Sequence, residues 1–365
     1  MKKQIKCLAR GLAALILALF IGDFCRGQSQ NEIAYYNTPA VMPNTAQEKN
    51  QELEQGINLC VGTQVVFASV GQARKTLTVP DRYINSFTPF DRQVRLNSQE
   101  PVSEKKHLDF VSEQALEWSQ YEKNRAEAAV KNLTARLKDY NLNLPTKIVL
   151  IKTTGKEEGG AAYCRGDAIV LPQNLLNSRG GNLEQLIAHE LFHIFTKNNL
   201  KSREALYSAI NFKRCEGKTE LPKKLLDMEI TNPDVPAQRY YVEVEHEGEN
   251  IKVVPMITIP NFDASKNRPF FSYLKLELVE VEKAENGYSY VRKEDNEPVV
   301  FTPQELPDYF KKVGENTSYV IHPEEILADN FALMVMGRQP VKSNWVIDKM
   351  KDQLGNKKSG GVGVN

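Results

Sequence analysis

The pentapeptide His189-Glu190-Leu191-Phe192-His193 constrains the fold of this chain more than any other feature of the sequence. On an α-helix, residues four apart leave the same face one turn apart, so both imidazoles can reach a single ion. Two neutral imidazole nitrogens can bind Zn²⁺ at about 2.0–2.1 Å each. Glu190 lies close by and can take a proton from a water molecule that the metal activates. The motif therefore predicts a helix that carries a zinc site and a general base.

The residues around the motif are mostly apolar, which is typical of a helix buried through the centre of a domain. Apolar side chains recur between residues 183 and 195, interrupted mainly by the two histidines, Glu190 and Gln185. Burying these polar groups costs free energy unless they have partners, and a metal ion can be that partner. The alternative is a pair of hydrogen-bonded core histidines that bind no metal.

A second motif, His322-Pro323-Glu324-Glu325 followed by Asp329, supplies carboxylates at helical spacing. Pro323 is favourable in the first turn of a helix, and Glu325 and Asp329 then share one face. Glu325 can complete a set of two histidines and one glutamate, which leaves a fourth position for water. Asp329 can accept a hydrogen bond from the outer nitrogen of a ligand histidine. The alternatives are a solvated acidic helix start and Glu324 as the ligand, although Glu324 has Ala328 four residues on.

Together the two motifs, HExxH and a distant ExxxD, resemble the gluzincin group of zinc metallopeptidases, which have the thermolysin-like architecture. The resemblance implies an α+β fold with a zincin-like core: a long helix, a small β-sheet, the HExxH helix and a second ligand helix. It implies one Zn²⁺ held by His189, His193 and Glu325, with Glu190 as the catalytic residue and Asp329 orienting a histidine. Thr196 and Asn199 stand where a metzincin has glycine and its third histidine, which excludes that arrangement.

The same resemblance implies a strand that forms the upper rim of the cleft and pairs with the substrate peptide. Residues 161–171 stand in the place of that strand, with Ala162, Tyr163 and Arg165 as the substrate-binding candidates. The alternative is an internal strand without ligand contacts. A donor to the oxyanion is also expected, and Tyr319 and His322 are the catalytic candidates, each of which can instead be a packing or supporting residue.

The first 27 residues have the layout of a secretory signal peptide. A basic start is followed by a 12-residue apolar run at 11–22, which is too short to cross a bilayer as an ordinary helix. The sequence therefore predicts export to the periplasm, cell envelope or outside, with no stable membrane insertion after cleavage. The alternative is an N-terminal membrane anchor.

The remaining pattern divides the chain into three further parts. Residues 28–106 are expected to be an N-terminal extension with possible short strands, one of them at 65–68. The catalytic domain is expected over 107–355, with a helix at about 108–139, a strand at 146–152, and an antiparallel β insertion of three or four strands at about 220–302. The tail at 356–365 is expected to be flexible.

The net charge bears on the class of binding partner, and the cysteine content bears on disulfide bonds. The chain has 47 basic and 46 acidic residues, a formal net charge of +1, which gives no indication of nucleic acid as a partner. After cleavage Cys60, Cys164 and Cys215 remain, which allows one disulfide or three buried thiols.

The predicted function is an exported zinc metallopeptidase that hydrolyses peptides or proteins. Two alternatives stay open: a non-catalytic cell-envelope binding or scaffold protein with a structural zinc site, and a zinc hydrolase of a non-peptide amide. The sequence pattern specifies neither the cleavage preference nor the oligomeric state.

Overall fold

The computed structural model describes residues 56–60, 62–178 and 182–355. These residues belong to one compact unit that begins at Gly56. The sequence placed the start of the catalytic domain at 107, whereas the structure builds residues 56–106 into the same unit. The predicted signal peptide (1–27), the first part of the N-terminal extension and the tail (356–365) lie outside the described residues.

Five strands form the first sheet, in the order β1-β2-β3-β5-β4. Strands β2, β3 and β5 are parallel, while β1 and β4 are antiparallel to their neighbours at the two edges. The bounds are β1 Ile57–Cys60, β2 Thr63–Phe67, β3 Lys147–Thr153, β4 Tyr163–Arg165 and β5 Ala168–Pro172. The strand predicted at 146–152 is β3, and the one at 65–68 corresponds to β2. Residues 161–171 form two strands of a hairpin, because Gly166 turns the chain with a positive φ of 56°.

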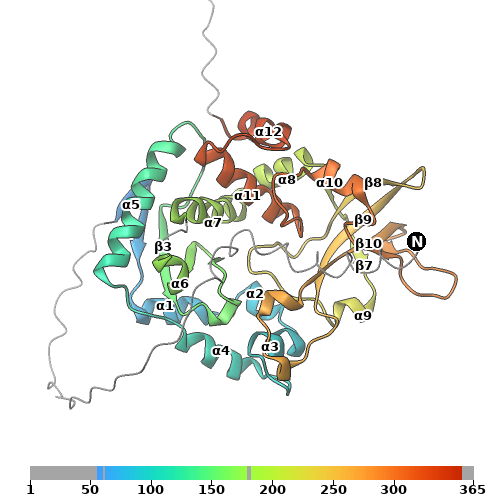
Figure 1. The fold of residues 1–365 in the computed structure, drawn as a ribbon, viewed down its shortest axis with the longest axis horizontal. Coiled ribbons are helices and arrows are strands. Elements are labelled where there is room, and N and C mark those ends of the chain that lie inside the picture. The colour runs from blue at the N-terminus through green and yellow to red at the C-terminus, as the bar shows by residue number, and fades with distance from the viewer. Residues whose placement is uncertain (1–55, 61, 179–181, 356–365) are drawn as a thin grey trace, which may run out of the picture. The chain divides into compact units, whose positions relative to one another are not determined.

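Helices cover both faces of this sheet, and the alternation of side chains along β3 explains why. Ile148 and Leu150 pack in the cluster that contains helices α5 (Gln120–Leu137) and α7 (Leu183–Asn198). Ile151, on the opposite face, packs with α1 (Val70–Leu77) and α4 (Glu104–Glu113). Figure 1 shows α7 crossing the centre of the unit beside α11 (Pro323–Met336).

The helix predicted at about 108–139 is two helices, α4 and α5, and the reason is local. Ala115 forms an isolated bridge with Thr153, and the backbone N–H of Leu116 bonds the carbonyl of Lys152. Ser119 then starts α5 with a capping box that it shares with Glu122. The apolar period runs through this break, so the pattern alone does not reveal it.

The predicted β insertion is larger than expected and is not purely antiparallel. It is a seven-stranded sheet in the order β6-β8-β9-β10-β11-β7, with β12 paired to β10, and β11 runs parallel to β7. Its strands are coloured from yellow through gold to orange along the chain in Figure 1. The bounds are β6 Phe212–Arg214, β7 Lys218–Glu220, β8 Tyr240–His246, β9 Glu249–Thr258, β10 Lys275–Ala284, β11 Gly287–Tyr290 and β12 Val300–Phe301.

Shorter helices complete the unit. Over the described residues it has two mixed sheets and twelve α-helices, which is compatible with an α+β fold. None of these helices is long and apolar enough to span a membrane. The remaining α-helices are α2 Arg82–Asn85, α3 Pro89–Arg95, α6 Gln173–Asn177, α8 Leu200–Ala209, α9 Lys223–Leu226, α10 Pro307–Val313 and α12 Asn344–Leu354. In the part of the chain that the structure describes, Cys60, Cys164 and Cys215 form no disulfide.

A buried ion pair fastens α5 to the sheet and gives a test of this architecture. Lys152 Nζ donates to Glu122 Oε2 at 2.7 Å, and both side chains are buried. Burial alone raises the pKa of Glu122, but hydrogen bonds from Lys152, Ser119 and Asn177 lower it from 4.5 to about 2.

We expect Glu122→Gln to destabilise the protein by about 2–4 kcal/mol at pH 7, because it leaves Lys152 buried without its counter-ion. Since the folded-state pKa is depressed, the stabilisation is present above pH 4.5 and is lost as the pH falls towards 2. Urea unfolding at several pH values measures the difference, with Glu127→Gln in an exposed pair as the control. Equal effects of the two substitutions at pH 7 would contradict the assignment.

Candidate metal centre

Helices α7 and α11 bring the two motifs together. Asn182 caps α7 by accepting from the N–H of Gln185, and His322 caps α11 ahead of Pro323. The helices pack through apolar side chains, including Phe192 and Phe331 with ring centroids 5.5 Å apart. This contact places the histidines of α7 over the first turn of α11.

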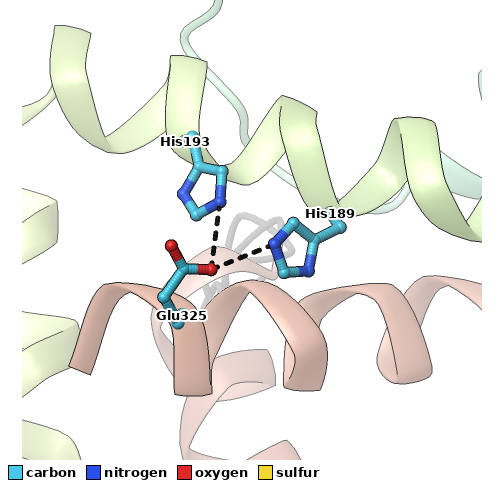
Figure 2. A group of neighbouring side chains, drawn as sticks. All are labelled: His189, His193 and Glu325. Carbon is cyan, nitrogen blue, oxygen red and sulfur yellow. Dashed lines mark ion pairs between the residues drawn. The ribbon is translucent and has the colours of Figure 1, made fainter. Parts of the chain in front are cut away.

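Three side chains converge between the helices, as Figure 2 shows. Glu325 Oε2 lies 3.3 Å from His189 Nε2 and 3.6 Å from His193 Nε2. Ligands bound to zinc at about 2.0–2.1 Å in a tetrahedron lie about 3.3–3.4 Å from one another. The two distances from Glu325 are close to this spacing, and all three donor atoms lie within 4.8 Å of one another, so the donor set fits one zinc ion.

The outer nitrogen of each histidine is held by its own carboxylate. His189 Nδ1 lies 2.9 Å from Asp329 Oδ1, and His193 Nδ1 lies 2.9 Å from Glu324 Oε1. With Nδ1–H donating to a carboxylate, each Nε2 presents a lone pair to the centre. Asp329 thus lies at the outer nitrogen of His189. Glu324, the rival ligand in the sequence, lies at the outer nitrogen of His193.

Further hydrogen bonds fix these carboxylates. Thr196 Oγ1 donates to Glu324 Oε1 at 2.5 Å, and the Tyr207 hydroxyl donates to Glu324 Oε2. Thr317 Oγ1 donates to Asp329 Oδ2 at 2.5 Å. Because their lone pairs are engaged on several sides, the two carboxylates cannot rotate freely and the imidazoles are held in one orientation.

Asn232 fixes the third donor. Its side-chain amide donates to Glu325 Oε1 at 2.7 Å, which leaves Oε2 facing the histidines. Glu325 is thus oriented to offer a single oxygen. Asn232 lies in the loop before β8 and has no spacing relation to either motif, so sequence reasoning could not find it.

Glu190 lies beside this centre and is 2% exposed. Burial, followed by the nearby Asp234 carboxylate, raises its pKa from 4.5 to about 7, while the two histidines act in the opposite direction. The Cys164 thiol donates to Glu190 Oε2 at 3.3 Å. A carboxyl group whose pKa lies near neutrality can both accept and return a proton at neutral pH.

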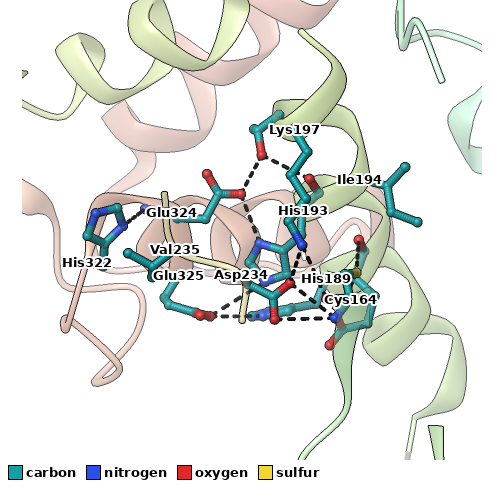
Figure 3. Close-up of polar contacts among 12 residues, drawn as sticks. Cys164, His189, His193, Ile194, Lys197, Asp234, Val235, His322, Glu324 and Glu325 are labelled. Atoms are coloured by element: carbon teal, nitrogen blue, oxygen red, sulfur yellow. Dashed lines mark hydrogen bonds and ion pairs between the residues drawn. The ribbon is translucent and has the colours of Figure 1, made fainter. Parts of the chain in front are cut away.

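The two oxyanion candidates lie in different surroundings. Burial raises the pKa of Tyr319 well above 10, and the carboxylates of Glu325 and Asp329 add to this effect, so its phenol keeps its proton near the centre. The His322 ring packs against Tyr207 and Tyr240, and its Nδ1 accepts from the N–H of Glu324 at 3.1 Å. Figure 3 shows it beyond Glu324, so His322 serves α11 as a cap.

Strand β4 lies at an edge of the first sheet, but two of its predicted substrate-binding side chains are engaged elsewhere. Tyr163 packs in the apolar cluster on the α1 and α4 face, and the Arg165 guanidinium donates to the carbonyls of Leu77 and Val79. Both residues are buried, and Ala162 is half-buried. Because side chains alternate along a strand, it is Cys164 that faces α7.

Comparisons with known proteins give one match. A family model described as "Putative zinc dependent peptidase (DUF5700)" matches residues 60–233, a little less than half of the chain. The match includes α7 and the HExxH motif and stops before Glu325. No curated protein and no solved structure matches the chain.

We expect Glu324→Gln to weaken zinc binding about 10- to 100-fold, because the neutral amide no longer supports the basicity and orientation of His193. Competition with a chromogenic chelator measures the affinity, and Glu315→Gln, an exposed residue before α11, is the control. An affinity equal to that of the control would show that Glu324 does not act through His193.

Proposed function

We propose that this protein is an exported zinc metallopeptidase of the gluzincin type, in which His189, His193 and Glu325 hold one zinc ion. The observation that carries the proposal is the convergence of three donor atoms within 4.8 Å of one another, with the carboxylate of Glu190 nearby. The zinc-dependent peptidase description of the matching family supports the same activity. Export rests on the layout of residues 1–27.

When bound, zinc supplies a Lewis acid that polarises a carbonyl and makes a water molecule more acidic. Two residues of this chain provide proton transfer and stabilisation of the oxyanion. Glu190 takes the proton of the attacking water and delivers it to the departing amine, for which a pKa of about 7 is suitable. Tyr319, which keeps its proton, donates to the developing negative charge on the carbonyl oxygen.

A structural zinc site in a non-catalytic protein is the competing function. The burial of the centre is compatible with it, since His193 and Glu325 are only 1% and 4% exposed. Structural zinc sites usually have four protein ligands. Here three side chains converge, and a buried glutamate outside this set of three, Glu190, lies near them, which favours catalysis.

We expect Glu190→Gln to retain zinc and to lower kcat on a peptide substrate by at least about 10²–10⁴-fold, because the amide cannot accept a proton. Metal analysis and a quenched-fluorescent peptide library measure the two properties on the same samples. Retained hydrolysis in the zinc-loaded variant would remove Glu190 from the mechanism. Absence of cleavage by the unaltered protein, across the library, would favour the structural site.

Tyr319→Phe tests the oxyanion donor. We expect kcat to fall about 10²–10³-fold with KM little changed, because the hydroxyl acts mainly on charge that develops in the transition state. Tyr121→Phe, at a side chain that is 62% exposed, is the matched control. A raised KM with unchanged kcat would instead make Tyr319 a residue of substrate binding.

A further inference from the structure

Residues 231–235, here called the strap, run past the metal centre between α9 and β8. The two ends of the strap are fastened to the α2 and α3 region. The Thr231 N–H donates to Asp91 Oδ2 at 3.0 Å, and Arg95 Nη2 donates to the Thr231 carbonyl at 2.6 Å. At the other end, Arg82 Nη2 donates to the Val235 carbonyl at 3.0 Å.

The middle of the strap enters the space beside the zinc ligands. Asp234 is 6% exposed, and its Oδ1 accepts from the backbone N–H of Cys164 at 3.1 Å and from Lys197 Nζ at 2.9 Å. Figure 3 shows the Asp234 carboxylate between Cys164 of β4 and the histidines of α7. Asp234 N–H also bonds Asn232 Oδ1 at 2.8 Å, which turns the strap back on itself.

The contact between Asp234 and Cys164 keeps a peptide from pairing with the edge of β4. Among the described residues, strand β4 pairs only with β5, so the Cys164 N–H is a backbone donor at the outer edge of the sheet. An extended peptide that adds to this edge would bring a carbonyl oxygen to that donor. The Asp234 carboxylate already occupies it, with Lys197 balancing its charge.

The burial of the centre agrees with this exclusion. Glu190 is 2% exposed and Glu325 is 4% exposed, with only His189 partly accessible. We expect part of this cover, with the strap among the segments beside the centre, to move before a peptide bond reaches both Glu190 and the zinc ligands.

We propose that the strap is a built-in competitive inhibitor, in which Asp234 takes the β4 backbone donor that a peptide substrate needs. This inference rests on the proposed peptidase function. Opening requires the Asp234 side chain to leave Cys164 and Lys197, whereas Asn232 keeps its hydrogen bond to Glu325. Pro233 and Pro236 restrict the backbone on either side of Asp234. The substrate then competes with the strap, so its apparent affinity is reduced by the fraction of molecules that are open.

The test measures access to zinc without requiring turnover. The probe is a dipeptide hydroxamate that binds zinc, titrated against the zinc-loaded protein. We expect Asp234→Asn to tighten binding about 10-fold or more, since a minor open state is commonly populated at about 0.1–10%. Asp227→Asn, in an exposed ion pair with Lys223 on α9, is the matched control and should leave the affinity unchanged.

A second variant covers the case in which Asp234→Asn fails to fold around an unpaired Lys197. Asp234→Ala combined with Lys197→Met removes both charges, and it should also tighten hydroxamate binding. Hydrogen–deuterium exchange should increase at the Cys164 amide and over the strap in either variant. Unchanged or weaker hydroxamate binding with unchanged exchange would overturn the inference and make the strap a fixed wall of the site.

The outcomes separate the two proposals. If the strap variants bind hydroxamate more tightly but neither they nor the unaltered protein cleave peptides, the strap controls access to the metal centre, but the peptidase proposal fails and the strap has no peptide substrate to compete with. If the unaltered protein cleaves peptides and the strap variants have the same kcat/KM and hydroxamate affinity, the peptidase proposal stands and the strap inference fails.

Discussion

Between α7 and α11 lie more buried carboxylates than the nearby cationic side chains can neutralise. The rest of the site depends on this excess of negative charge. Five buried carboxylates, from Glu190, Asp234, Glu324, Glu325 and Asp329, face Lys197 and two imidazoles. Burial alone would lower the pKa of His193, but Asp234 and Glu325 outweigh it and raise it to about 9. A field that favours protonated histidines also favours a divalent cation at the same place. The two imidazole nitrogens and the carboxylate oxygen at this place are a donor set that suits zinc.

The sequence predicts which residues lie together where those residues are on the same helix. His189, Glu190 and His193 follow from the helical period, and so does the placement of Glu325 and Asp329 on one face of α11. Helical spacing gives Glu324 no partner on its own helix, because the residue that it contacts, His193, lies on another helix. The sequence does not predict the break between α4 and α5, because the break results from the pairing of Ala115 and Leu116 with β3. The spacing of apolar residues carries no information about such a tertiary contact.

The same distinction explains why the strap could not be foreseen. Asn232 and Asp234 look like ordinary loop residues beside Pro233, and only the tertiary fold brings them to Glu325 and to the edge of β4. The role of the seven-stranded sheet is left open by the sequence pattern, and the strap lies between its strands β7 and β8 in the chain. Large insertions of this kind commonly carry the loops that set substrate access on a rigid scaffold. Here the insertion brings one of its own carboxylates to the donor that a substrate would use.

X-ray absorption spectroscopy at the zinc edge, combined with metal analysis of the full chain, tests the central claim most directly. The account predicts one zinc per chain, two imidazole nitrogens and carboxylate or water oxygen at about 2.0–2.2 Å, and no sulfur. Glu325→Ala should change the oxygen shell and leave the imidazoles. A sulfur ligand at about 2.3 Å would point to Cys164 with Glu190 and Asp234, the other buried group that could hold an ion, and would contradict the assignment.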